Sequence, residues 1–359
     1  MNKANTPSSV WFTDMSAKPG ASLLDKTSAV IRAAGLEKAV REGALTAVKL
    51  HFGEKGNTAF IRPIFLRRIV EEIVSLKAKP FLTDTNTLYV GSRSNLVDHL
   101  QTAIANGFAH SVVGAPLVIA DGLRGESIVR LPGGKECPEV MIGAEIARAD
   151  AMVVVSHFKG HEITGFGATL KNLGMGCAAR SGKLAQHSTV GPVVQPDGCN
   201  GCSACMAHCP VDAIKPVSGK AFISPDVCIG CADCMVVCPN QAIHVNWNEV
   251  SPLVQRKMVD HALGAVYGKK GSLLFISFVM QVSPLCDCYG FSDRAIAPDL
   301  GILASTDPVA LDQACMDLII KEMGRDPISE THPTVDWTIQ LAYAEEVNLG
   351  TRNYELNTL

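Results

Sequence analysis

The chain has 359 residues, of which 47% are hydrophobic and 19% charged, and its formal net charge is −3 at pH 7. This length exceeds that of a usual single domain, and the composition is that of a folded protein with a sizeable core. The sequence has no Lys/Arg-rich run and no apolar run of about twenty residues, so we expect no nucleic-acid partner and no membrane span.

The N-terminal segment, residues 1–9, is polar, and no apolar stretch with a small-residue cleavage site follows it. We therefore expect no secretory signal. Thirteen cysteines in a chain without export information favour reduced, metal-binding thiols over disulfides, because disulfides persist in oxidising compartments. The sequence predicts a cytoplasmic protein.

Strand and helix patterns alternate along most of the chain, which is typical of an α/β sheet with crossover helices. Short β-branched runs predict strands at residues 10–13, 45–50, 80–83, 117–120, 151–156, 272–278 and 301–304. Apolar residues at three- and four-residue spacing predict helices at residues 22–41, 63–76, 95–106, 252–267, 308–321 and 335–347. The predicted fold class is therefore α/β, with a mixed or parallel sheet flanked by helices.

Eight of the thirteen cysteines form two copies of the pattern C-x2-C-x2-C-x3-C-P. This spacing is typical of two [4Fe–4S] clusters, in which three closely spaced thiolates bind one cluster and the cysteine before the proline binds the other. We expect one cluster on Cys199, Cys202, Cys205 and Cys238, and a second on Cys228, Cys231, Cys234 and Cys209. Two zinc sites are the alternative, but zinc seldom uses a third regularly spaced cysteine followed by Cys-Pro.

These cysteines interrupt the alternation of strands and helices. A polar, Pro/Gly-rich stretch at residues 191–198 leads into them, and the alternation resumes after Trp247. We therefore expect an inserted two-cluster, ferredoxin-like α+β module at residues 191–247. The two parts of the α/β domain are then residues 1–190 and 248–359.

Reactive side chains follow five of the predicted strands. Ligands of open α/β sheets bind beyond the carboxyl ends of the strands, so we expect these side chains to converge on one rim. They are His51, Glu54, Lys55 and Asn57, then Asp84 and Asn86, then Asp121, then residues 157–177, and finally Cys286, Asp287 and Cys288.

Histidines and a lysine of this rim are candidates for proton transfer and anion binding. His51 and His161 are of the type that changes charge near neutral pH, although His51 can equally hydrogen-bond within its loop. Lys171 lies in a glycine-rich stretch that suits an anionic group, with a solvated lysine as the alternative. His157 and His161 have the spacing of a helical metal pair, but Gly160 between them favours a loop.

The remaining rim candidates are cysteines. Cys286 and Cys288 offer soft metal ligands or a redox thiol pair, and the alternative is two small residues in a turn. Cys177 ends the glycine-rich stretch, whereas Cys137 and Cys315 are expected to be small buried hydrophobes. The candidate catalytic set is His51, His161, Lys171, Cys177, Cys286 and Cys288. The rim is also a candidate site for an additional metal or a small anionic cofactor.

Six segments together resemble the family of bacterial and archaeal iron–sulfur proteins catalogued as domain of unknown function family 362, with a bacterial-type ferredoxin module inserted. They are residues 48–54, 84–89, 156–162, 171–177, 286–288 and 305–312. The resemblance covers nearly the whole chain and implies an iron–sulfur protein, but no general reaction.

A more distant similarity is to the N-terminal half of nickel-pincer lactate racemases, which pair a histidine with a lysine ten residues later across a glycine-rich loop. The matching residues here are His161 and Lys171. The chain departs from those enzymes by its ferredoxin module and by the Cys286 and Cys288 pair, so the similarity implies a shared pocket only.

The expected function is an iron–sulfur oxidoreductase. Two clusters would relay electrons between a soluble partner, such as ferredoxin or flavodoxin, and a small-molecule substrate or cofactor at the strand carboxyl ends. A bare carrier would need only the module, whereas most of this chain lies outside it. Two alternatives remain open: an electron-transfer or metallocluster-delivery protein without its own chemistry, and a non-redox isomerase or transferase with structural clusters.

Overall fold

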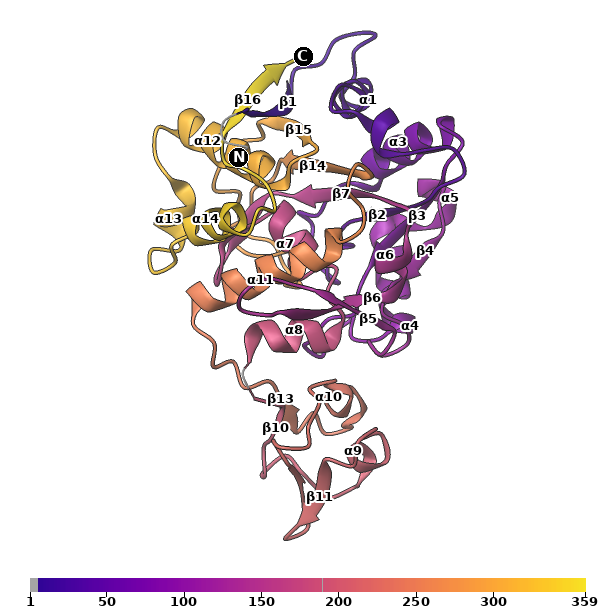
Figure 1. Ribbon diagram of the computed structural model, residues 1–359, viewed down its shortest axis with the longest axis vertical. Helices are drawn as coiled ribbons and strands as arrows, with labels where there is room; N and C mark the ends of the chain where they lie inside the picture. The colour runs from indigo at the N-terminus through magenta and orange to yellow at the C-terminus, as the bar shows by residue number, and fades with distance from the viewer. Residues whose placement is uncertain (1–5, 189) are drawn as a thin grey trace.

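The computed structural model describes residues 6–188 and 190–359. Most of them form an α/β body around one eight-stranded sheet with the strand order β16-β1-β15-β14-β7-β2-β3-β4. A small lobe, formed by the cysteine-rich segment, projects from one end of this body beyond α8 (Figure 1). No helix within the described ranges is long and apolar enough to cross a membrane.

The sheet contains all seven predicted strands and one that was not predicted. Its strands are β1 (Ser8–Asp14), β2 (Leu45–Lys49), β3 (Lys79–Asp84), β4 (Leu117–Ile119), β7 (Ala151–His157), β14 (Leu273–Val279), β15 (Gly301–Ser305) and β16 (Tyr354–Thr358). The strands from β14 to β4 run parallel, whereas β15 is antiparallel to both β14 and β1. The predicted α/β fold with a mixed sheet is therefore confirmed.

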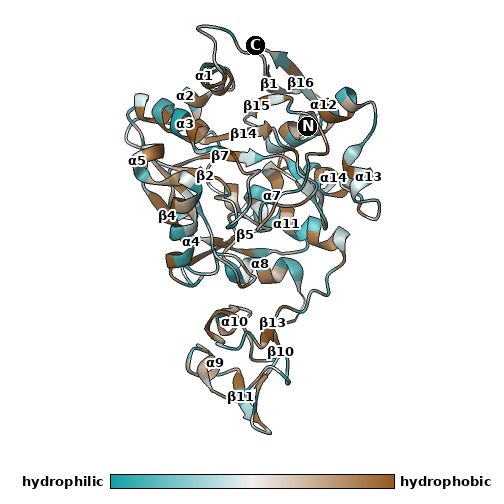
Figure 2. Cartoon of the chain, turned by 180° about the vertical axis from the view of Figure 1, so that it is seen from behind, coloured by the Kyte–Doolittle hydropathy of each residue, from teal (hydrophilic) through white to brown (hydrophobic). Residues whose placement is uncertain are grey.

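Helices cover both faces of the sheet, because its central strands are apolar on both sides. In β7, Met152 and Val154 belong to one buried cluster, and Val153 and Val155 belong to the other. This alternation follows from the two-residue period of a strand. Hydrophobic residues accordingly run along the central strands (Figure 2).

The helices divide between these two clusters. The first face is covered by α7 (Thr169–Gly174), α11 (Ser251–Val266), α12 (Pro308–Met323) and α14 (Thr338–Glu346). The second is covered by α1 (Leu23–Ala33), α2 (Leu36–Ala39), α3 (Pro63–Ser75), α4 (Leu96–Ala103), the π-helical turn η1 (Ile104–Phe108) and α5 (His110–Val113). Each predicted helix has a counterpart here, and α5 and α7 were not predicted.

The predicted helix at residues 22–41 is wrong as a single element. Ser22 caps α1 in a capping box with Asp25, as its sequence position allows. The backbone then breaks at Gly35, whose φ of 98° lies in the left-handed region that favours glycine. The chain continues as the separate helix α2.

Shorter elements complete the body. They are the hairpin of β5 (Ile128–Pro132) and β6 (Glu139–Gly143), α6 (Ala144–Arg148), the hairpin of β8 (Lys159–His161) and β9 (Gly165–Gly167), α8 (Arg180–His187) and α13 (Pro327–Thr331). The β8–β9 hairpin corrects the expectation of a loop between His157 and His161. Gly160 is needed there because a Cβ would lie 2.2 Å from the Pro284 carbonyl oxygen.

The lobe contains two short hairpins and two short helices. They are β10 (Val193–Val194) with β13 (Ile243–His244), β11 (Ile214–Val217) with β12 (Lys220–Ile223), α9 (Ala204–Ala207) and α10 (Asp233–Val237). Cys205, Cys234 and Ile243 are buried in the lobe's own small core. Leu88 and Leu184 of the body belong to the same cluster, so the lobe packs against the body through apolar side chains.

Candidate functional site

One large pocket lies where the parallel strands end, with about 970 Å³ of empty space that includes its opening to solvent. Its walls include Lys49 at the end of β2, Asp84 at the end of β3 and His157 at the end of β7. Cys286, in the loop after β14, closes another side. The carboxyl ends of parallel strands share one edge of the sheet, which is where ligands of such folds bind.

Five of the six candidate catalytic residues line this pocket. They are His51, His161, Lys171, Cys286 and Cys288. Cys177 does not: its side chain is fully buried in the hydrophobic core, and its thiol donates to the Asn172 carbonyl at 3.6 Å. Burial raises the pKa of Cys177 to about 11, so the sequence-based assignment of Cys177 to the site is corrected to a core residue.

Cys286 is surrounded by hydrogen-bond donors. The thiol of Cys288 donates to its sulfur, and the Lys171 ammonium does so at 2.8 Å. The Cys288 backbone N–H adds a contact of 3.4 Å. The Cys288 thiol, followed by Lys171 and His161, lowers the pKa of Cys286 well below its ordinary value despite burial. The pair therefore shares one proton, with Cys286 as the thiolate.

Asp287, between the two cysteines, anchors their loop. Its buried carboxylate is 2.9 Å from Nδ1 of His157 and 3.5 Å from Nζ of Lys159. Nε2 of His157 faces the Met280 carbonyl at 2.9 Å. The His157 ring therefore joins the Asp287 carboxylate to the Met280 carbonyl. This pairing turns Asp287 inward and the flanking thiols toward the pocket.

His51 and His161 are neutral hydrogen-bond donors. Nδ1 of His51 accepts from the Gly53 N–H at 2.9 Å, and Nδ1 of His161 accepts from Ile163 and Thr164 N–H at 3.2 Å. Backbone N–H groups can only donate, so each ring carries its proton on Nε2. Burial lowers the pKa of His51 to about 3 and lowers that of His161 as well. The expectation that His51 titrates near neutral pH is therefore corrected.

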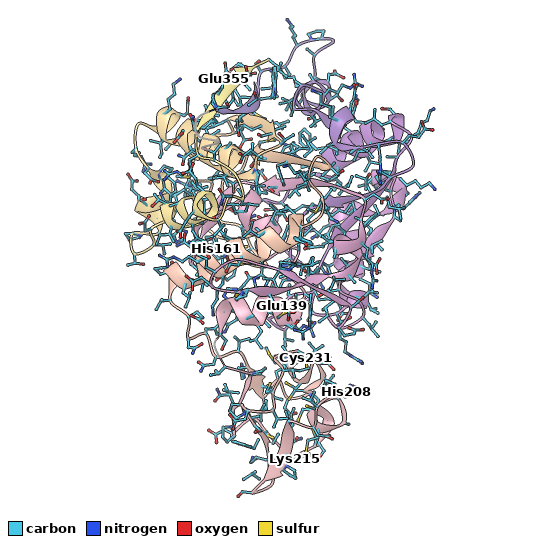
Figure 3. All side chains as sticks on the ribbon, in the orientation of Figure 1. Glu139, His161, His208, Lys215, Cys231 and Glu355 are labelled. Carbon is cyan, nitrogen blue, oxygen red and sulfur yellow. The ribbon has the colours of Figure 1, made fainter. Side chains whose placement is uncertain are left out.

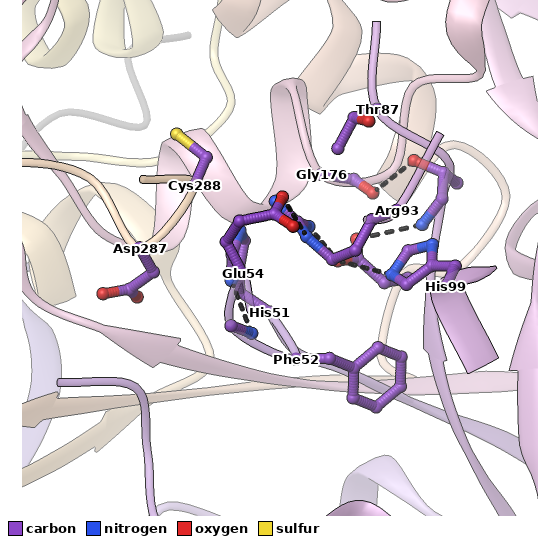
Figure 4. A network of polar contacts seen from close by, with 12 residues as sticks. His51, Phe52, Glu54, Thr87, Arg93, His99, Gly176, Asp287 and Cys288 are labelled. Carbon is purple, nitrogen blue, oxygen red and sulfur yellow. Dashed lines mark hydrogen bonds and ion pairs between the residues drawn. The ribbon is translucent and has the colours of Figure 1, made fainter. Parts of the chain in front are cut away.

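A buried network of charges supports one wall of the pocket. Lys49 is 3.0 Å from Asp84, and Arg93 lies 3.5 Å from Asp84 and 3.2 Å from Glu54. His99 lies beside Arg93, on the side away from Glu54 (Figure 4). Burial alone would raise the pKa of Asp84, but Lys49, with the neighbouring histidines and Arg93, holds that pKa well below its ordinary value.

Sequence reasoning missed several pocket residues. Lys49, Tyr89, Arg93 and Lys183 line the cavity but were not proposed as site residues. Lys49 follows four apolar or β-branched residues at the end of a strand, and this position could have identified it. Lys183 lies on α8, far along the chain from any predicted strand end, and carried no such signal.

The eight cysteines of the lobe surround two further cavities. One, of about 510 Å³, is lined by Cys199, Cys202, Cys205 and Cys238. The other, of about 330 Å³, is lined by Cys209, Cys228, Cys231 and Cys234. Each cavity therefore takes three thiols from one motif and the fourth from the other. All thirteen cysteines are free thiols.

The second of these cavities is the one near the body. Cys231 lies at the end of the lobe that faces the body, and Lys215 lies at its far tip (Figure 3). Gly230 approaches Leu184 of α8 so closely that a Cβ there would be 3.4 Å from the leucine side chain. The neighbours of Leu184 on that helix, Lys183 and His187, line the large pocket. One helix thus separates a four-cysteine cavity from the pocket.

A family model described as domain of unknown function (DUF362) matches residues 46–317. No curated protein matches the chain. Among solved structures, the lactate racemase apoprotein from Thermoanaerobacterium thermosaccharolyticum is 13% identical with a TM-score of 0.41, over 82% of this chain and 53% of that one. A protein from Thermotoga maritima is 8% identical with a TM-score of 0.38, over 73% and 52%. The chain spans about half the length of each.

Alkylation kinetics test the Cys286 thiolate. At pH 7, iodoacetamide is expected to modify Cys286 well before Cys177, whose pKa is raised. Lys171→Gln removes a donor to the Cys286 sulfur and should slow its alkylation about tenfold, because one pKa unit changes the thiolate fraction by that factor. The exposed Lys270→Gln is the matched control. Equal rates in both variants, measured by peptide mass spectrometry, would contradict the assignment.

Urea unfolding tests the buried charge network. Asp84→Asn keeps the shape of the side chain but leaves Lys49 and Arg93 without their shared carboxylate, so the free energy of unfolding should fall by about 3–5 kcal/mol at pH 7. Because the pKa of Asp84 is held below its ordinary value, this contribution is present at neutral pH and is lost as the pH falls below about 4.

The control for this measurement is Arg130→Gln. It breaks the exposed ion pair with Glu139, so it should change the stability little. If Asp84→Asn were as mild as this control at pH 7, the network would not have the role assigned to it.

Proposed function

The chain belongs to the DUF362 family, whose description names no reaction, and we propose a function from the site itself: an iron–sulfur oxidoreductase that delivers electrons to a substrate in the large pocket. Two [4Fe–4S] clusters in the lobe would receive the electrons from a soluble carrier such as ferredoxin or flavodoxin. The lobe would then be an inserted two-cluster ferredoxin-like module.

The observation that carries this proposal is the grouping of cysteines around two cavities. Each cavity is lined by four thiols in the crossed arrangement of two-cluster proteins. Backbone N–H groups also point at these sulfurs. Ala221 donates to Cys199 at 3.4 Å, and Ala213 and Ala242 donate to Cys209 and Cys238 at 3.2 Å. Such donors stabilise anionic sulfur, so the residues present fit the clusters.

The geometry fits zinc less well. A zinc ion needs its ligands to converge on one point at about 2.3 Å from each sulfur. Across residues 6–188 and 190–359, no three His, Cys, Asp or Glu side chains converge in that way. The third regularly spaced cysteine and the Cys-Pro of each motif favour clusters over zinc.

The residues of the pocket suit a substrate that accepts electrons. When bound, the clusters would supply single-electron transfer at low potential. Cys286, held as a thiolate by Lys171, can bind or polarise a substrate beside it. His51 and His161 can donate hydrogen bonds from Nε2 to negative charge that develops on the substrate. Leu88 and Leu184 keep water from the contact between lobe and pocket.

Metal analysis and electron paramagnetic resonance test the clusters. Protein purified without oxygen should contain about eight iron and eight sulfide ions per chain. Cys234→Ala and Cys209→Ala should abolish the same cluster signal although they lie in different motifs, because their sulfurs line one cavity. Cys199→Ala and Cys238→Ala should abolish the other.

The control is Cys137→Ala, outside the lobe, which should keep both signals. Zinc without sulfide, or signal losses grouped by motif instead of by cavity, would contradict the assignment.

Turnover distinguishes an oxidoreductase from a carrier. With reduced ferredoxin or a reduced viologen as donor, candidate substrates should be reduced, and Cys286→Ala should lower kcat by at least about a hundredfold while both cluster signals persist. A variant with full clusters and undiminished turnover would refute a role for the pocket thiolate. Activity with the clusters held oxidised would favour a non-redox reaction.

A further inference from the structure

The large pocket contains five side chains that are cationic at neutral pH. They are Lys49, Arg93, Lys159, Lys171 and Lys183. Three of them pair with a carboxylate. Lys49 pairs with Asp84, Arg93 with Glu54, and Lys159 with Asp287. A buried cation without such a partner is unfavourable, so the two remaining lysines indicate what the pocket is built to hold.

Lys171 and Lys183 differ in their partners. Lys171 donates to Cys286, which supplies a negative charge as thiolate. Lys183 donates only to neutral oxygens, the hydroxyl of Thr85 and the carbonyl of Ala178 at 2.6 Å. No carboxylate of the described residues lies within ion-pair distance of Lys183. Lys183 is therefore the pocket cation with no anionic group at hydrogen-bond or ion-pair distance, although the charges of Asp121 and Asp84 partly offset the effect of burial on its pKa.

The ammonium of Lys183 also has a hydrogen-bonding position to spare. It carries three N–H groups, and Thr85 and Ala178 accept from two of them. Lys49 differs, because Leu50, Asn172 and Asp84 together occupy its three donors. Burial lowers the pKa of Lys183 to about 8, which still leaves the ammonium form dominant at pH 7.

The wall near these polar groups is largely apolar. Leu88, Val155, Ile163, Met175 and Trp247 line the same pocket. Trp247 packs edge-on against His187, with 4.9 Å between the ring centroids, and His187 is one helical turn from Lys183 on α8. A ligand that satisfies both kinds of surface has one charged end and a hydrocarbon body.

We propose that the pocket binds a small organic anion, with its anionic head on Lys183 and its apolar body along the wall of Leu88, Val155, Ile163, Met175 and Trp247. Carboxylates and phosphate monoesters share this chemistry. Anion binding itself does not depend on the proposed function. The identification of this anion as the molecule to be reduced rests on it. Its head on Lys183 would leave the other end of the molecule free to meet Cys286 and Lys171.

Isothermal titration calorimetry on the full-length, anaerobically purified protein tests the anion site without turnover. The probes are hexanoate, hexyl phosphate and the neutral hexanamide. At least one of the two anions should bind at least about tenfold more tightly than hexanamide, and the tighter one identifies the head group. Lys183→Gln should weaken that anion about tenfold and leave hexanamide unchanged, whereas Lys183→Arg should retain most of the affinity.

Controls separate the site from general charge effects and from folding. Lys270→Gln, at an exposed position, should leave anion affinity unchanged. Thr85→Val removes the hydroxyl that positions the Lys183 ammonium and provides a second, independent loss of affinity. Hexanamide binding as tight as anion binding, or an undiminished anion affinity in folded Lys183→Gln, would overturn the proposal. Loss of cluster signals with intact anion binding would refute the proposed function alone.

Discussion

The site depends on two buried carboxylates that are each in contact with buried basic side chains. Asp84 lies between Lys49 and Arg93, and Asp287 lies against His157 and Lys159. A buried charge without partners is strongly unfavourable, so these groups must be placed together for the pocket to form. Asp287 in turn orients the two thiols beside it. These ion pairs therefore fix the positions of the reactive groups of the pocket.

The protein keeps two kinds of sulfur chemistry apart. The lobe's eight thiols surround two cavities, where backbone N–H groups approach several of the sulfurs. In the pocket, one thiolate is stabilised by a neighbouring thiol and by Lys171. Leu88 and Leu184 join the two regions through one apolar contact. This arrangement places the large pocket beside one four-cysteine cavity, with an apolar contact between them.

Local patterns were sufficient for most of the fold. The β-branched runs of the central strands are buried on both sides, so their sequences carry a strong signal. β16 (Tyr354–Thr358) was missed because it lies at the edge of the sheet, pairs only with β1 and is only partly buried. The helix break at Gly35 depends on a left-handed backbone that helical periodicity does not register.

The sequence by itself determined seven of the eight sheet strands, the grouping of the eight lobe cysteines and five of the six pocket candidates. Each of these follows from short-range spacing or from position after a strand, which the chain carries locally. Only the tertiary structure decided that Lys171 meets Cys286, that Cys177 faces the core and that Lys183 lines the pocket without a carboxylate at ion-pair distance. Those facts depend on burial and on contacts between distant segments, and local patterns encode neither. Lys171 and Cys286, for example, are more than a hundred residues apart in the sequence.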